Sequence, residues 1–132
     1  MSEITTLDCK IYVDAAIGRS ELVERIGQLL QAQVEKNTVL GLDFEIDVLK
    51  NDEFDESRRQ EFPDGFLHFY IVLELYFSSV RQAQDRVTMV SKILEYLWSE
   101  GIPAVAACDY EVELPRSGGY KDRSAPWPEH RL

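Results

Sequence analysis

The chain has 132 residues, with 14 Lys and Arg against 24 Asp and Glu, so its formal charge at neutral pH is −10. This length suits a single domain, and an apolar share of 45% with six Phe, six Tyr and two Trp excludes a wholly disordered chain. The acid excess disfavours nucleic acid and membrane surfaces as partners, because both attract clusters of Lys and Arg. No catalytic, metal-binding or cofactor motif stands out, so we expect no cofactor.

The N-terminal residues 1–6 lack the basic and apolar blocks of a signal peptide. No stretch of the chain approaches the roughly 20 apolar residues that a membrane span needs. We therefore expect a cytoplasmic protein. The two cysteines, Cys9 and Cys108, lack metal-site or redox-motif spacing, and a reducing compartment would keep them as thiols.

The first half of the chain predicts a strand, a helix and a second strand. Residues 4–14 alternate between apolar and polar side chains, which is typical of a half-buried strand. Ser20 is the expected N-cap of an amphipathic helix over residues 21–36, whose apolar residues recur at spacings of three and four. Alternation returns over residues 39–49, which predicts the second strand.

The second half predicts strand, helix and strand again. After a polar turn, residues 66–77 are apolar on both faces, as in a central strand. A second helix follows Ser78-Ser79 and is ended by Gly101 and Pro103, and residues 105–114 form the last strand.

We expect residues 1–115 to form the domain. The Gly- and Pro-containing tail, residues 116–132, carries Tyr120 and Trp127 and is expected to pack on the domain or on a partner.

The predicted order of elements, β-α-β-β-α-β, resembles the split pattern of ferredoxin-like domains. That resemblance implies an α+β fold with a four-stranded antiparallel sheet in the order 4-1-3-2. Right-handed crossovers would place both helices on one face of this sheet and leave the other face open.

The outward-pointing residues of the four predicted strands would share that open face, and most of them are acidic or aromatic. Like charges on neighbouring strands are mildly destabilising. So many carboxylates on one face therefore favour a docking surface for a basic protein partner. The carboxylates would steer the partner, and the tyrosines would anchor it. The most concrete version is an immunity or inhibitor protein that covers a nuclease-type toxin. The candidate partner-binding residues are Tyr12, Asp43, Glu45, Asp47, His68, Tyr70, Glu74, Tyr76, Asp109, Glu111 and Glu113.

Other uses of these residues stay open. A charged face also serves solubility and protection against aggregation, and a symmetric homodimer is another way to bury it. A small enzyme or ligand-binding domain with a cross-strand site around His68 and Tyr70 is the alternative from a different functional class, because His68 is the only histidine inside a predicted element. Cys9 and Cys108 are expected on neighbouring strands facing the helices, where a disulfide is conceivable.

Overall fold

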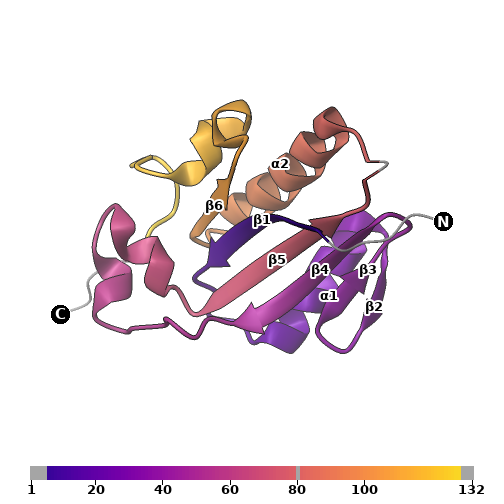
Figure 1. The fold of residues 1–132 in the computed structure, drawn as a ribbon. Helices are drawn as coiled ribbons and strands as arrows, with labels where there is room; N and C mark the ends of the chain where they lie inside the picture. The colour runs from indigo at the N-terminus through magenta and orange to yellow at the C-terminus, as the bar shows by residue number, and fades with distance from the viewer. Residues whose placement is uncertain (1–5, 80, 129–132) are drawn as a thin grey trace.

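Six strands form one antiparallel sheet in the order β2-β3-β4-β5-β1-β6 (Figure 1). The computed structural model describes residues 6–79 and 81–128; the first two residues of the predicted first strand, Val80 of the predicted helical stripe and tail residues 129–132 lie outside this range. The strands are β1 (Thr6–Val13), β2 (Gln33–Glu35), β3 (Thr38–Leu40), β4 (Phe44–Lys50), β5 (Ile71–Phe77) and β6 (Ala104–Cys108). The fold class is thus α+β, but the sheet has six strands where the sequence predicted four.

Two helices, α1 (Arg19–Leu30) and α2 (Ala83–Ser99), lie behind the sheet in Figure 1. Alternate residues of the long strands pack against them in the main core, among them Ile11, Ile46 and Leu73, which have no exposed surface. Burying apolar side chains between one sheet face and two helices is the main stabilising contribution of such a layered fold. Among the described residues, no helix is long and apolar enough to cross a membrane.

The first helix is shorter than predicted, and a hairpin replaces its second half. Gln31 adopts a left-handed conformation with φ of 53°, which ends α1. Strands β2 and β3 follow, joined by two residues of which Lys36 has φ of 57°. The prediction of a helix over residues 21–36 was wrong there because tertiary contacts outweigh helix propensity: Val34 packs against Gly27 of α1, whose missing side chain makes room for it. The N-cap is Gly18 rather than Ser20.

The third predicted strand begins five residues later than expected. Residues Asp64–His68 form a 3₁₀ turn, η2, and β5 starts at Ile71. The side-chain amide of Asn51 donates to the carbonyl oxygens of Leu67 and Phe69 at 2.9 and 2.8 Å. These backbone groups are therefore satisfied outside a strand ladder.

The last strand has half the length that the sequence predicted. β6 ends at Cys108, and Glu111–Glu113 forms a further 3₁₀ turn, η3. The carboxylate of Glu111 accepts a 2.9 Å hydrogen bond from the backbone N–H of Cys108, and the N–H groups of Glu113 and Leu114 donate to Tyr110 and Glu111, so these backbone groups are satisfied within the turn. The second predicted helix starts at Ala83, several residues after the expected Ser78-Ser79 cap, with Gln82 as its N-cap.

A second, smaller core lies on the sheet face away from the helices. Phe66, Phe69 and Val105 are its buried members, and Tyr12, Tyr120 and Trp127 pack against them. The ring of Phe66 lies edge-on to Tyr12 and to Tyr120, with centroid distances of 5.3 and 5.6 Å. Trp127 contacts Phe69 and donates a 3.0 Å hydrogen bond to the carbonyl oxygen of Gln60. The tail therefore packs, through Tyr120 and Trp127, against the sheet and the segment that precedes β5.

Candidate partner-binding face

The pairing register fixes which side chains share the sheet face away from the helices. Directly opposed residues on antiparallel strands project to the same side. Following the register from β2 to β6 gives a row that crosses the whole sheet: Glu35, Thr38, Asp47, Glu74, Lys10 and Ala107. The next row, toward the β3–β4 turn, contains Gln33, Leu40, Glu45, Tyr76 and Leu7.

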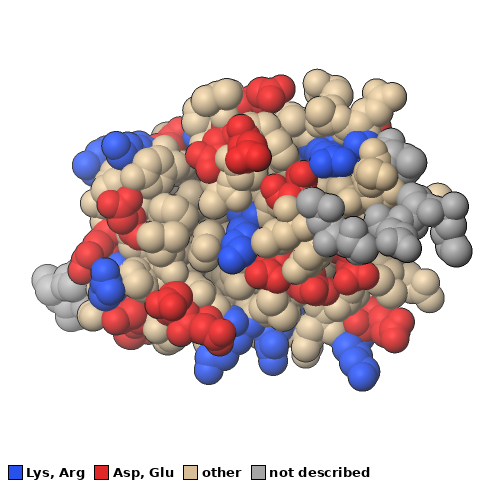
Figure 2. Space-filling view, viewed as in Figure 1, with Lys and Arg blue, Asp and Glu red and all other residues tan. Residues whose placement is uncertain are grey.

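Four carboxylates stand in these two rows, and we call the surface formed by Glu35, Glu45, Asp47 and Glu74 the acidic face. In Figure 2, Asp and Glu side chains gather over the middle of the sheet on this side. Lys10 lies 3.8 Å from Glu74, and the hydroxyl of Thr38 donates to Asp47 at 3.0 Å. One lysine against four carboxylates leaves this surface strongly negative. Within the described residues, no cluster of His, Cys, Asp and Glu is arranged to hold a metal ion.

The pKa of Tyr76 is raised by the negative charge of the acidic face. Its hydroxyl donates a 3.0 Å hydrogen bond to Glu74. Desolvation, this hydrogen bond and the charges of Glu74, Asp47 and Glu45 raise the pKa of Tyr76 to about 12. The three carboxylates therefore act together on one phenol, as expected for a continuous charged surface.

Apolar side chains border the acidic face at the β3–β4 end. Leu7 opposes Tyr76 and is 43% exposed, while Leu40 opposes Glu45. Leu42, at the tip of the β3–β4 turn, is fully exposed. The carboxylates can steer a charged partner toward this surface, and burial of the neighbouring leucine and tyrosine side chains would stabilise the complex.

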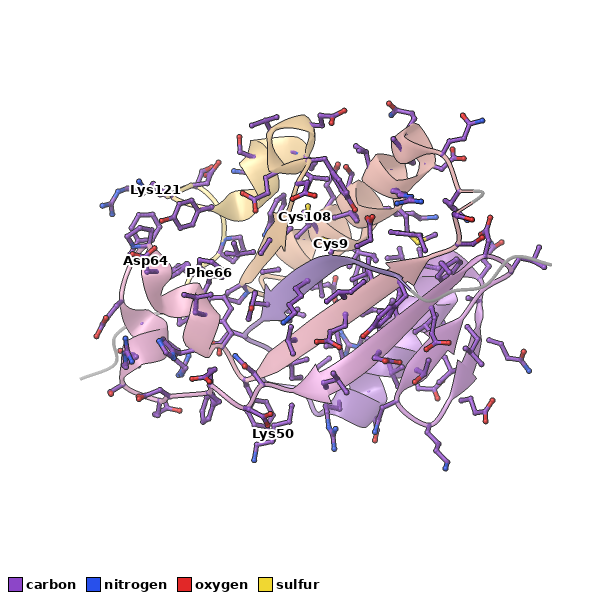
Figure 3. All side chains as sticks on the ribbon, viewed as in Figure 1. Cys9, Lys50, Asp64, Phe66, Cys108 and Lys121 are labelled. Atoms are coloured by element: carbon purple, nitrogen blue, oxygen red, sulfur yellow. The ribbon has the colours of Figure 1, made fainter. Side chains whose placement is uncertain are left out.

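The opposite end of the same sheet face is covered. The third row contains Leu49, Val72, Tyr12 and Val105, and Phe66 of η2 and the tail pack over its Tyr12 and Val105 end. Figure 3 shows Phe66 and Asp64 of η2 beside Lys121 of the tail. The open face of the predicted sheet is therefore open only in part.

The structure brings four of the candidate residues together on the exposed part of this face, namely Glu45, Asp47, Glu74 and Tyr76. Tyr12 shares the sheet face but lies beneath Phe66. Asp43 lies in the β3–β4 turn, where it forms a 2.5 Å ion pair with Arg81. Its predicted place in a strand was wrong.

The remaining candidates lie outside the strands. His68 ends η2, with its ring Nδ1 2.8 Å from the carbonyl oxygen of Glu53, and Tyr70 stacks edge-on against Phe54 at 5.2 Å. The prediction that these two residues lie in the third strand was therefore wrong, because that strand starts at Ile71. Glu111 and Glu113 belong to η3, and Asp109 lies in the turn before it, so the prediction that these three point outward from the last strand was also wrong.

Sequence reasoning missed Glu35 as a member of the acidic face and Leu40 as a residue beside it. The predicted helix over residues 21–36 includes Glu35, and the alternation over residues 39–49 predicts that Leu40 faces the helices. A signal was present: Lys36-Asn37 separates Gln33-Val34-Glu35 from Thr38-Val39-Leu40, and a two-residue connection between short segments with β-branched residues is typical of a hairpin.

A cleft of about 1230 Å³ lies at the end of β1, between the segment before β5 and the tail. Asp14 and Arg59 line it and form a 2.6 Å ion pair, and Arg59 also contacts Glu56 at 2.9 Å. Burial raises the pKa of Asp14, and the Arg59 guanidinium opposes that shift. The guanidinium is held by two carboxylates, so it is already engaged within the protein. His68 does not line this cleft.

Scanning the chain against protein-family models gave no match, and searches of curated proteins and of solved structures also gave none. Function is therefore inferred from the geometry of the acidic face.

Proposed function

We propose that this protein works by binding, and that the acidic face docks a basic protein partner. The observation that carries the proposal is the row in which Asp47 and Glu74 are directly opposed across β4 and β5, with Glu45 in the adjacent row. Directly opposed like charges disfavour folding by a few tenths of a kcal/mol up to about 1 kcal/mol. A basic side chain from a partner would relieve that repulsion on binding.

The shape of the surface supports a protein as the partner. The acidic face is carried by strands rather than by loops, so its carboxylates are held in a fixed array before any partner arrives. Exposed Leu7 and Leu42, together with the partly buried Leu40 and the ring of Tyr76, border it. Positive charge complementary to the carboxylates would speed association, and burial of these apolar groups would slow dissociation.

The most concrete form of the proposal is an immunity or inhibitor role in the cytoplasm, in which the acidic face covers the cationic substrate site of a nuclease-type toxin. Such a site binds phosphate through Lys and Arg, and a rigid array of carboxylates competes for the same side chains.

We also propose that the fold is a ferredoxin-like arrangement extended by the β2–β3 hairpin. Its support is that β6, β1, β5 and β4 are consecutive in the sheet.

The test uses a variant in which Glu45→Gln, Asp47→Asn and Glu74→Gln remove three charges from the acidic face. Its matched control carries Glu24→Gln, Asp52→Asn and Glu95→Gln, three exposed carboxylates outside the acidic face. A basic protein that copurifies with the wild-type chain is identified, produced alone and titrated calorimetrically against each variant over a range of salt concentrations.

We expect the acidic-face variant to bind at least about tenfold more weakly, with a shallower dependence of affinity on salt, because three steering charges are lost. The control variant, with the same net charge, should stay within about twofold of the wild type. Equal weakening of both variants would show that only net charge matters and would overturn docking at this face.

A symmetric homodimer is the competing use of the acidic face. Stacking two negative surfaces requires desolvation of carboxylates without complementary partners, which is unfavourable. Sedimentation equilibrium distinguishes the two uses, because a dimer through this face should be strengthened by the three neutral substitutions, whereas a complex with a basic protein should be weakened.

A further inference from the structure

The two cysteines of the chain are direct partners across β1 and β6. Cys9 pairs with Cys108 in the register of these antiparallel strands, and both side chains pack on the main core side of the sheet. Figure 3 labels them close together on neighbouring strands. They are separated by 99 positions in the sequence, so only the tertiary structure joins them.

The hydrogen-bond pattern shows which kind of pair they form. The backbone N–H of Asp14 donates to the carbonyl oxygen of Pro103 at 2.9 Å, and hydrogen-bonded and non-hydrogen-bonded pairs alternate from there along the two strands. Five positions further, Cys9 and Cys108 fall on a non-hydrogen-bonded pair. In agreement, the N–H of Cys108 donates to Glu111 instead of to Cys9.

Non-hydrogen-bonded pairs are the closer kind. Their Cα atoms are about 4.5 Å apart, with the side chains directed toward each other. Disulfides span Cα separations of about 4.4 to 6.8 Å. The position of Cys9 and Cys108 as such a pair is therefore compatible with the spacing that a disulfide needs.

The two thiols differ in exposure and in ionisation. Cys9 is 2% exposed, whereas Cys108 is only half-buried beside the start of η3. The neighbouring Cys9 thiol lowers the pKa of Cys108, against the opposing effects of burial and of Glu111 and Asp8. The neighbouring Cys108 and burial raise the pKa of Cys9, whose thiol donates to the carbonyl oxygen of Lys10 at 3.6 Å. This asymmetry makes Cys108 the thiolate that attacks first.

We infer that Cys9 and Cys108 form a dithiol site that low-molecular-weight disulfides oxidise reversibly. The thiolate of Cys108 attacks one sulfur of the small disulfide, whose S–S bond breaks and releases one thiolate, leaving a mixed disulfide on Cys108. Sγ of Cys9 then gives up its proton and attacks Sγ of Cys108, which releases the second small thiol. Two electrons pass from the protein dithiol to the small disulfide, and the product links β1 to β6.

The test incubates the folded protein in glutathione buffers of graded ratio, quenches with acid, alkylates the remaining thiols and measures the intact mass. We expect both thiols of the wild type to disappear together, with no glutathione retained and with full recovery after dithiothreitol. The oxidised protein should unfold at a higher temperature than the reduced one, because the crosslink restricts the unfolded chain.

Single substitutions identify the two roles. Cys9→Ala should stop at one glutathione bound to Cys108, because no second thiol resolves the mixed disulfide. Cys108→Ala should leave Cys9 unmodified while the protein is folded, because Cys9 is buried. Circular dichroism of both variants checks that they fold.

Two outcomes of the wild-type experiment would overturn the inference without reference to any variant. One is the retention of both thiols in buffers dominated by oxidised glutathione. The other is a stable mixed disulfide on Cys108 that Cys9 never resolves. Both thiols face the helices rather than the acidic face, so neither result depends on the proposed partner.

Discussion

The hydroxyl of Tyr76 donates a hydrogen bond of 3.0 Å to Oε1 of Glu74, two residues earlier on the same strand. Both side chains lie on the exposed part of the sheet face away from the helices, where Glu45 and Asp47 are their neighbours on β4. The neutral phenol is stabilised here, because ionising it would lose this hydrogen bond and add a charge to a negative surface.

We predict that Glu74→Gln lowers the pKa of Tyr76 from about 12 toward its ordinary value of 10. Asp47→Asn should produce a smaller decrease, because Asp47 acts on the phenol through charge alone. NMR of Cζ-labelled tyrosine over alkaline pH measures both shifts. A Tyr76 resonance that titrates identically in wild type and Glu74→Gln contradicts the coupling.

The same shift has a consequence for stability at high pH. The folded-state pKa of Tyr76 is raised, so its contribution is fully present below pH 10 and is lost between about pH 10 and 12. Tyr76→Phe should therefore flatten the decline of the urea unfolding midpoint over that interval. If the decline keeps the wild-type slope, other groups cause it.

We predict that Asp8→Ala destabilises the fold by about 2–3 kcal/mol. The Asp8 carboxylate accepts hydrogen bonds from Arg86 of α2 at 2.8 Å and from the hydroxyl of Tyr110 at 2.5 Å. Removing it leaves both donors without this partner in a largely buried place. Urea unfolding measures the loss, and Glu24→Ala on the exposed side of α1 is the control, expected within about 0.5 kcal/mol of wild type. Equal effects of the two would contradict a structural role for Asp8.

Gly27→Ala should destabilise the protein by about 1–3 kcal/mol, even though alanine is the better helix former. A β-carbon at residue 27 would meet Cγ2 of Val34 on β2 far inside van der Waals contact. In a Val34→Ala background the obstructing methyl is absent, so the same substitution should cost clearly less. A double-mutant cycle by chemical unfolding gives this coupling. Additive effects would mean that β2 does not lie against α1.

We predict a cost of about 2 kcal/mol for Trp127→Ala, because its half-buried ring packs on Phe69 and Phe62 and its indole N–H donates to Gln60. Trp127→Phe retains an aromatic ring and loses the hydrogen bond, so it should cost about 1 kcal/mol. Denaturant unfolding followed by circular dichroism separates the two. An unchanged midpoint for Trp127→Ala would show that the tail contributes nothing to stability.

Local sequence pattern determined the type of most long elements. Alternation around Ile11, Ile46 and Leu73 predicted strands whose apolar side meets helices, and these residues are fully buried. The sequence also predicted the apolar side of α2 and the end of this helix before Gly101, where φ is 73°. These features depend on periodicity and on conformational preference, both of which are local.

The composition of the acidic face was decided by the tertiary structure. Glu35 belongs to it because β2 folds back along β3, while Glu111 does not, because β6 ends at Cys108 and Glu111 lies in η3. Register and strand length depend on partners far away in the sequence. Alternation therefore predicts which side of its own strand a residue faces, but it does not predict which residues lie beside it on the next strand. The sequence by itself therefore determined that this chain is acidic and of the α+β class. Only the packing of distant segments decided which carboxylates share a surface, and that Cys9 meets Cys108.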